Sequence, residues 1–187
     1  NKKLYDDKTW KTEEPIDHIW VEYYRCRLNN QDARVLTKVH DSLLSRNVDA
    51  EIYIREEYDW IRSALDHENR DKYVEEKTAR TGRAYPLDES MRLPIIQGLV
   101  GWERKMKAIG VTDYLGIATA LSRHKDRISP RYRSIIVDES QDFGTIELNI
   151  LRRLCEPNEN DLFLCGDAAQ QVSSKHQNLR EADISVP

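Results

Sequence analysis

Apolar residues recur at intervals of three and four over much of the first 130 residues, as in helices that bury one face. Pro94 suits the first turn of one such helix, and Gly110 suits its end. The apolar positions of this clearest case are Ile95, Leu99, Trp102, Met106 and Ile109. We therefore expect residues 1–130 to be mainly helical.

The same spacing predicts further helices at residues 31–45, 55–66 and 113–124, the last of them capped by Thr112. Residues 50–54, with the sequence AEIYI, suit a short β-strand.

From residue 134 the pattern changes to two short, continuous apolar runs, SIIVD and DLFLC. Such runs are typical of strands covered on both faces. Residues 144–160 between them suit a helix that is capped by Thr145 and ends near Pro157. A strand, a helix and a strand of this length form a right-handed crossover of a parallel sheet. Residues 131–187 are therefore predicted to be the α/β part of the chain.

Composition narrows the possible functions. The 187 residues carry a formal net charge of -4, and 33% of them are charged. This balance disfavours a uniformly basic surface, so any nucleic-acid contact should be local. No apolar run approaches the roughly 20 residues that cross a bilayer. We expect a cytoplasmic protein that does not span a membrane.

Polar side chains follow both predicted strands. Asp138, Glu139 and Asp142 come after the first, and Asp167 and Gln170 come after the second. Ligands of open α/β sheets gather at the carboxyl ends of the strands. Clustered carboxylates repel one another and favour a compensating cation such as hydrated Mg²⁺.

Two other interpretations fit the acidic residues. Asp138 and Asp142 could merely cap the following helix. Alternatively, Asp138, Glu139 and Asp142 could bind Mg²⁺ directly in a nuclease or phosphatase, which would leave the segment GDAAQ without a role.

The segments IIVDESQD and LFLCGDAAQ resemble motifs II and III of UvrD/Rep-type superfamily I DNA helicases. The preceding helices have the order of the accessory insertion that leads into the Walker B strand of that family. The resemblance implies a partial RecA-like P-loop NTPase sheet preceded by a mainly helical insertion subdomain. It also implies that DNA is the partner, as single strands and duplex junctions.

The resemblance assigns roles at matching positions. Asp138 would hold Mg²⁺ through its water shell, and Glu139 would accept a proton from the water that attacks the γ-phosphate of ATP. Gln170 would contact the γ-phosphate region. Gln141 and Asp142 would join the polar network around motif II, and Asp167 would orient the motif III loop.

A phosphate-binding G-x-x-x-x-G-K-[ST] loop is absent, because none of the seven glycines precedes a lysine. We therefore interpret the chain as a fragment whose partner is the remainder of a helicase, and which alone should not hydrolyse ATP at a useful rate. The alternative is a noncatalytic DNA- or partner-binding module with a helicase-like fold. Salt-sensitive DNA binding that ATP does not affect would favour that alternative.

Three basic segments are candidates for contact with nucleic-acid phosphates. The segment after Gln170 lacks the aromatic residue that stacks on a DNA base in many relatives, which puts stacking by this loop in doubt. The candidate residues are Arg80, Arg83, Arg127, Arg131 and Lys175.

Overall fold

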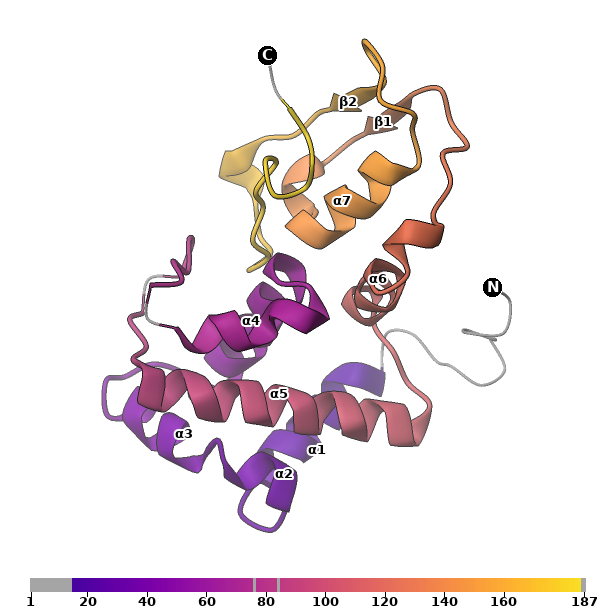
Figure 1. Cartoon of the computed structure of the whole chain (residues 1–187). Helices are drawn as coiled ribbons and strands as arrows, with labels where there is room; N and C mark the ends of the chain where they lie inside the picture. Colours follow the sequence, from indigo (N-terminus) through magenta and orange to yellow (C-terminus); the bar gives the residue numbers. More distant parts are fainter. Residues whose placement is uncertain (1–14, 76, 84, 186–187) are drawn as a thin grey trace.

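The computed structural model describes residues 15–75, 77–83 and 85–185. Helices form a broad lower body, and a small α/β part lies above it (Figure 1). The α-helices are α1 (Pro15–Arg25), α2 (Gln31–Arg34), α3 (Thr37–Leu44), α4 (Ala50–Ala64), α5 (Glu89–Ile109), α6 (Tyr114–Ser122) and α7 (Thr145–Arg153). The strands are β1 (Ile135–Val137) and β2 (Leu162–Leu164). Short 3-10 turns are η1 (His67–Val74), η2 (Lys125–Arg127), η3 (Ser140–Asp142) and η4 (Ala168–Gln170).

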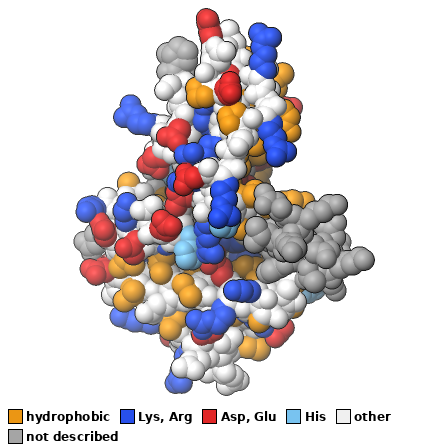
Figure 2. All heavy atoms as spheres, turned by 45° about the vertical axis from the view of Figure 1, so that its right-hand side comes forward, with side chains coloured by type: hydrophobic (Ala, Val, Ile, Leu, Met, Phe, Trp, Pro, Cys, Tyr) orange, Lys and Arg blue, Asp and Glu red, His pale blue; other side chains and the backbone are white. Residues whose placement is uncertain are grey.

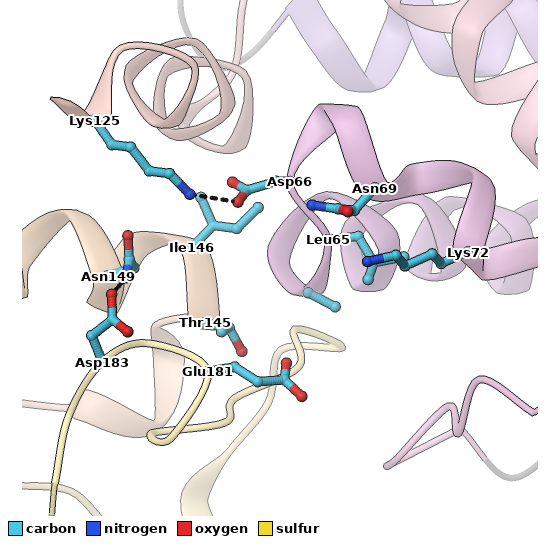
Figure 3. A pocket seen from close by; sticks show the side chains of 11 residues that line it. Leu65, Asp66, Asn69, Lys72, Lys125, Thr145, Ile146, Asn149, Glu181 and Asp183 are labelled. Atoms are coloured by element: carbon cyan, nitrogen blue, oxygen red, sulfur yellow. Dashed lines mark hydrogen bonds and ion pairs between the residues drawn. The ribbon is translucent and has the colours of Figure 1, made fainter.

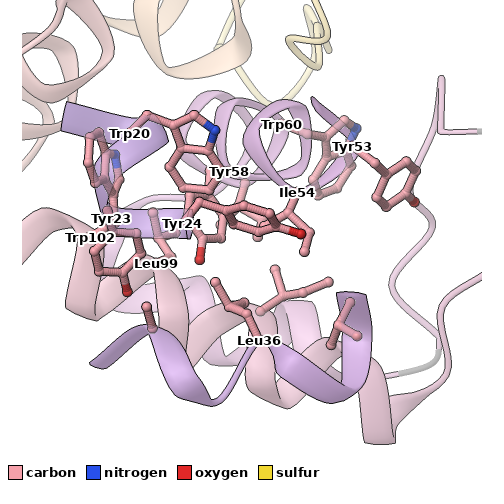
Figure 4. Packing of buried hydrophobic residues seen from close by; sticks show 14 of the residues in the cluster. Trp20, Tyr23, Tyr24, Leu36, Tyr53, Ile54, Tyr58, Trp60, Leu99 and Trp102 are labelled. Carbon is pink, nitrogen blue, oxygen red and sulfur yellow. The ribbon is translucent and has the colours of Figure 1, made fainter. Parts of the chain in front are cut away.

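An aromatic cluster forms the centre of the helical body (Figure 4). The indole of Trp102, from α5, meets Trp20, from α1, edge to face with ring centroids 5.4 Å apart. Tyr58, from α4, meets Trp20 in the same manner at 5.4 Å. Such edge-to-face pairs add to the free energy gained by burying apolar area. The cluster therefore ties α1, α4 and α5 together.

Helix α5 confirms the clearest periodic pattern of the sequence at its buried positions up to Met106, whereas Ile109 in its last turn is exposed. The side chain of Asp88 accepts a hydrogen bond from the backbone N–H of Met91, and Gly110 ends the helix with a φ of 76°. The prediction for Pro94 was wrong, because the helix begins at Glu89 and Pro94 lies inside it.

Helix α4 includes residues 50–54, which were predicted as a strand. The Asp49 carboxylate accepts hydrogen bonds from the N–H groups of Glu51 and Ile52, which starts the helix there. Ile54 is buried on the same helical face as Tyr58 and Ile61, and Tyr53 is also buried. Tertiary packing over a 15-residue helix thus outweighs the local β-propensity.

The strands β1 and β2 pair in parallel, as predicted, with Ile135 opposite Leu162 and Val137 opposite Leu164. Helix α7 lies between the strands and α4 (Figure 1). Ile136 is 77% exposed and Phe163 is 62% exposed, so the opposite face of this pair is uncovered. The prediction of strands covered on both faces was therefore wrong for the described residues.

Gly144, which precedes α7, lies against α4 of the helical body. A Cβ atom at this position would meet the backbone of Ser63, near the end of α4, at 3.2 Å, and would clash with its Cβ. Gly144 N donates a hydrogen bond to Glu147 Oε2 at 2.8 Å, so the predicted cap residue Thr145 is instead the first helical residue.

The fold also bears on membrane insertion. Among the described residues, no helix has the length and apolar character needed to cross a membrane.

Candidate nucleotide site at the ends of β1 and β2

An acidic turn follows β1. Asp138 and Glu139 are exposed, and the turn η3 comes directly after them. The Asp138 carboxylate accepts a hydrogen bond from Glu139 N at 3.0 Å. Glu139 has φ and ψ of 51° and 41°, the left-handed conformation that a residue with a Cβ adopts at a cost of about 1 kcal/mol. Backbone strain of this kind is concentrated at functional sites.

Gln141 joins the two strand ends. Its buried side chain donates from Nε2 to Glu139 Oε2 at 2.6 Å and accepts at Oε1 from Asp167 N at 3.0 Å. The backbone continues the ladder, because Ser140 N donates to Cys165 O at 2.7 Å. The carboxylate after β1 and the loop after β2 are therefore parts of one hydrogen-bonded unit.

The loop after β2 presents Gln170. Gln170 Nε2 donates to Asp167 Oδ2 at 3.0 Å, and Asp167 Oδ1 accepts from Ala169 N at 2.9 Å. The hydrogen bond from Ala169 N, followed by that from Gln170, lowers the pKa of Asp167 below its ordinary value. The Asp167 carboxylate is thus hydrogen-bonded to two residues of the turn that follows it.

Gly166 is part of this unit, although it was not among the predicted site residues. A Cβ atom there would clash with Gln141 Oε1 and would lie 2.7 Å from Ser140 Oγ. The available signal was a glycine between an apolar strand and an acidic residue, where another group approaches the backbone closely.

The donor set suits a hydrated cation. Mg²⁺ is commonly held through one or two carboxylates and several waters, and Asp138 supplies one exposed carboxylate at the strand end. Within the described part of the chain, no three His, Cys, Asp or Glu side chains lie together as a metal site. Asp138, Glu139 and Asp142 accordingly do not form the direct three-ligand site of the nuclease interpretation.

Arg80 and Arg83 are bound internally. Arg80 Nη2 donates to Glu57 Oε2 at 2.7 Å, and Arg83 Nε donates to the same oxygen at 2.9 Å. Glu57 is fully buried, and its Oε1 also accepts from the Tyr73 hydroxyl at 2.7 Å. This arrangement gives both arginines a structural role and does not favour contact with phosphate. Their attraction to one buried carboxylate could not be seen in the sequence.

Arg127 and Arg131 are exposed on the connection between α6 and β1, and neither forms an ion pair with a described residue. Lys175 differs, because its Nζ donates to Glu147 Oε1 at 2.9 Å. Basic and acidic side chains are mixed over the face shown in Figure 2, without one continuous basic patch.

Comparison with known proteins identifies the family. No curated protein and no solved structure matches the chain significantly. The family model described as "UvrD/REP helicase N-terminal domain" matches residues 6–185. That match spans the helical body, the acidic turn and the loop after β2. The chain therefore belongs to the UvrD/REP helicase N-terminal domain family.

Proposed function

We propose that this chain supplies the acidic half of the ATP-hydrolysing site of a DNA helicase, and that residues 131–187 form part of a RecA-like motor domain preceded by a helical insertion. The observation that carries this proposal is the Gln141 bridge between the ends of β1 and β2. It brings together the carboxylate and amide groups that phosphoryl transfer needs at one edge of a parallel sheet.

Each side chain has a task that its geometry permits. Asp138 would hold Mg²⁺ through water, and the cation would neutralise charge that develops on the phosphates. The hydrogen bond from Gln141 orients the Glu139 carboxylate, whose Oε1 would accept the proton of the attacking water. Gln170 would contact the γ-phosphate region. Asp142 and Asp167 would support the two loops.

Binding of DNA would use exposed cations close to this part of the chain. Arg127 and Arg131 are suited to contacting phosphates because they are solvent-exposed and have no carboxylate partner among the described residues. The phosphate-binding loop would come from sequence outside this chain, because the chain contains no Gly-Lys pair.

The test is hydrolysis of Mg²⁺-ATP by the parent helicase that carries this chain. We expect Glu139→Gln and Asp138→Asn each to reduce kcat at least 100-fold, and to leave the unfolding midpoint of the protein nearly unchanged because both residues are exposed. A parent protein that binds DNA with steep salt dependence but never hydrolyses ATP would instead identify a noncatalytic binding module.

A further inference from the structure

The segment that follows Gln170 folds back over the acidic turn. We call residues 171–178 the return segment; it contains no helix or strand. Gln171 Nε2 donates to Lys175 O at 3.1 Å, inside the segment. Gln177 Nε2 donates to Ser140 O at 2.6 Å, in the turn η3. The chain therefore returns from the Gln170 loop to the other half of the candidate site.

Lys175 fastens the return segment to the acidic turn and to α7. Its Nζ donates to the carbonyl oxygen of Asp142 at 3.0 Å and to Glu147 Oε1 at 2.9 Å. Both side chains of the ion pair are largely buried, at 20% exposed for Lys175 and 14% for Glu147. A pair of this kind is screened less by solvent than a surface pair.

His176 fastens the same segment to α4. Its N–H donates to Ser63 Oγ at 2.9 Å, and its ring lies 5.2 Å from the indole of Trp60 between centroids. On the other side, His176 O accepts hydrogen bonds from Thr145 N at 2.9 Å and from Thr145 Oγ1 at 3.1 Å. A single residue thus connects the helical body with the first turn of α7.

The joint between these parts is not closely packed throughout. A cavity of about 420 Å³ separates the residues after α4 from α7, and polar side chains from both face it (Figure 3). Thr145 lines this cavity and also binds His176. The return segment adds its hydrogen bonds to the direct packing of α7 on α4 and α6.

We infer that Lys175 and His176 are positioning residues, which tie the loop that presents Gln170 to helix α4 of the insertion. The inference rests on the proposed function, because it assigns Gln170 to the γ-phosphate region. A change in how α4 sits on α7 would move His176, and through the five residues between them it would move Gln170. Lys175 and His176 need not touch ATP or DNA.

The first test compares Lys175→Met and His176→Ala with wild type in the parent helicase. We expect kcat for Mg²⁺-ATP to fall about tenfold in each, with less than a twofold change in KM, because a displaced group affects the reaction more than ground-state binding. Lys175→Arg should recover most of the lost kcat. Turnover equal to wild type in both variants would overturn the inference.

Arg152→Met is the matched control. Arg152 Nη2 forms a similarly buried ion pair with Asp161 at 2.6 Å, but at the amino ends of the strands, away from the candidate site. We expect it to lower the unfolding midpoint while leaving turnover per folded molecule unchanged. An equal loss of kcat in Arg152→Met would show that Lys175 acts through stability alone.

A fluorescence titration tests the contact to α4 without ATP. Burial lowers the pKa of His176, against the opposing charge of Glu181. Since a protonated imidazole quenches a neighbouring indole, Trp60 emission in this chain should fall as the pH is lowered through that pKa. We expect Trp60→Phe and His176→Gln each to remove this transition.

Failure of this inference can be distinguished from failure of the proposed function. If His176→Gln leaves the Trp60 transition unchanged, the contact to α4 is absent and the inference fails. If the transition is present but Glu139→Gln does not impair ATP hydrolysis, the proposed function fails while the contact stands.

Discussion

Arg62 and Asp113 form a buried ion pair that joins α4 to the start of α6. Arg62 Nη1 donates to Asp113 Oδ2 at 2.7 Å, and the Asp113 carboxylate also caps α6 by accepting from Gly116 N at 2.7 Å. Burial of Asp113 opposes its ionisation, but the charge and hydrogen bonds of Arg62 outweigh it and lower the pKa of Asp113 to about 2. The charged carboxylate therefore contributes to stability.

This pair predicts a loss of stability in acid. An unfolded aspartate has a pKa of about 3.9, so the contribution is complete above that pH and is lost as the pH falls toward 2. It should be on the order of 2 kcal/mol. Urea unfolding at several pH values should show this dependence in wild type and not in Asp113→Asn. Asp126→Asn, at an exposed position, should keep the wild-type dependence.

Substitution of Glu57 should destabilise the chain strongly. Burial would raise the pKa of Glu57, but the hydrogen bonds and charge of Arg80 hold it below its ordinary value. Glu57→Gln leaves Arg80 and Arg83 without their shared counter-charge, which should cost about 3 kcal/mol in the free energy of unfolding. Urea denaturation measures this cost.

Glu56→Gln is the control for Glu57. Glu56 pairs with Arg83 at 2.7 Å, but its side chain is 45% exposed, so its loss should cost less than about 1 kcal/mol. Equal costs at the two positions would contradict the structural role of the buried carboxylate.

The left-handed backbone of Glu139 predicts an unusual order of stabilities. Glycine adopts this conformation without a steric penalty, whereas alanine does not. We therefore expect Glu139→Gly to be about 1 kcal/mol more stable to urea than Glu139→Ala, while neither variant supports ATP hydrolysis. The same pair of substitutions at Glu156, which is exposed and outside the left-handed region, should not favour glycine.

Arg127 and Arg131 predict a change in salt dependence. For single-stranded DNA, the slope of log K against log salt changes by about 0.7 for each phosphate that the protein no longer neutralises. Arg127→Ala and Arg131→Ala should each reduce the slope by that amount in binding titrations. Arg83→Ala, which removes an internally paired cation, should destabilise the protein but leave the slope unchanged.

Much of the architecture could be predicted because it depends on the local spacing of apolar residues along the chain. The period of α5 and the two apolar runs were sufficient to place that helix and the parallel strands. The strand prediction at residues 50–54 failed because five residues do not show whether a segment is the start of a longer buried helix. The exposure of Ile136 could not be predicted either, because the apolar character of a residue does not show whether another element covers it.

Part of the candidate site could be predicted from the sequence, and part of it could not. Strand order and the resemblance predicted that Glu139 and Gln170 would lie in one region, and Gln141 connects their loops. The partners of Arg80 and Lys175 could not be predicted, because Glu57 and Glu147 lie 23 and 28 residues away along the chain. Pairing over such separations depends on the tertiary fold rather than on local sequence.

Gly144 lies against Ser63 of α4, and the absence of a side chain there permits this close approach. Because the Cβ of Ser63 would lie within 2.5 Å of an added Cβ atom, even an alanine at this position would clash with α4. The added methyl group would push α7 away from α4, without a direct effect on the packing inside either part. The absence of a side chain at position 144 therefore permits the close approach of α7 to α4, and Gly144→Ala is the smallest substitution that would oppose it.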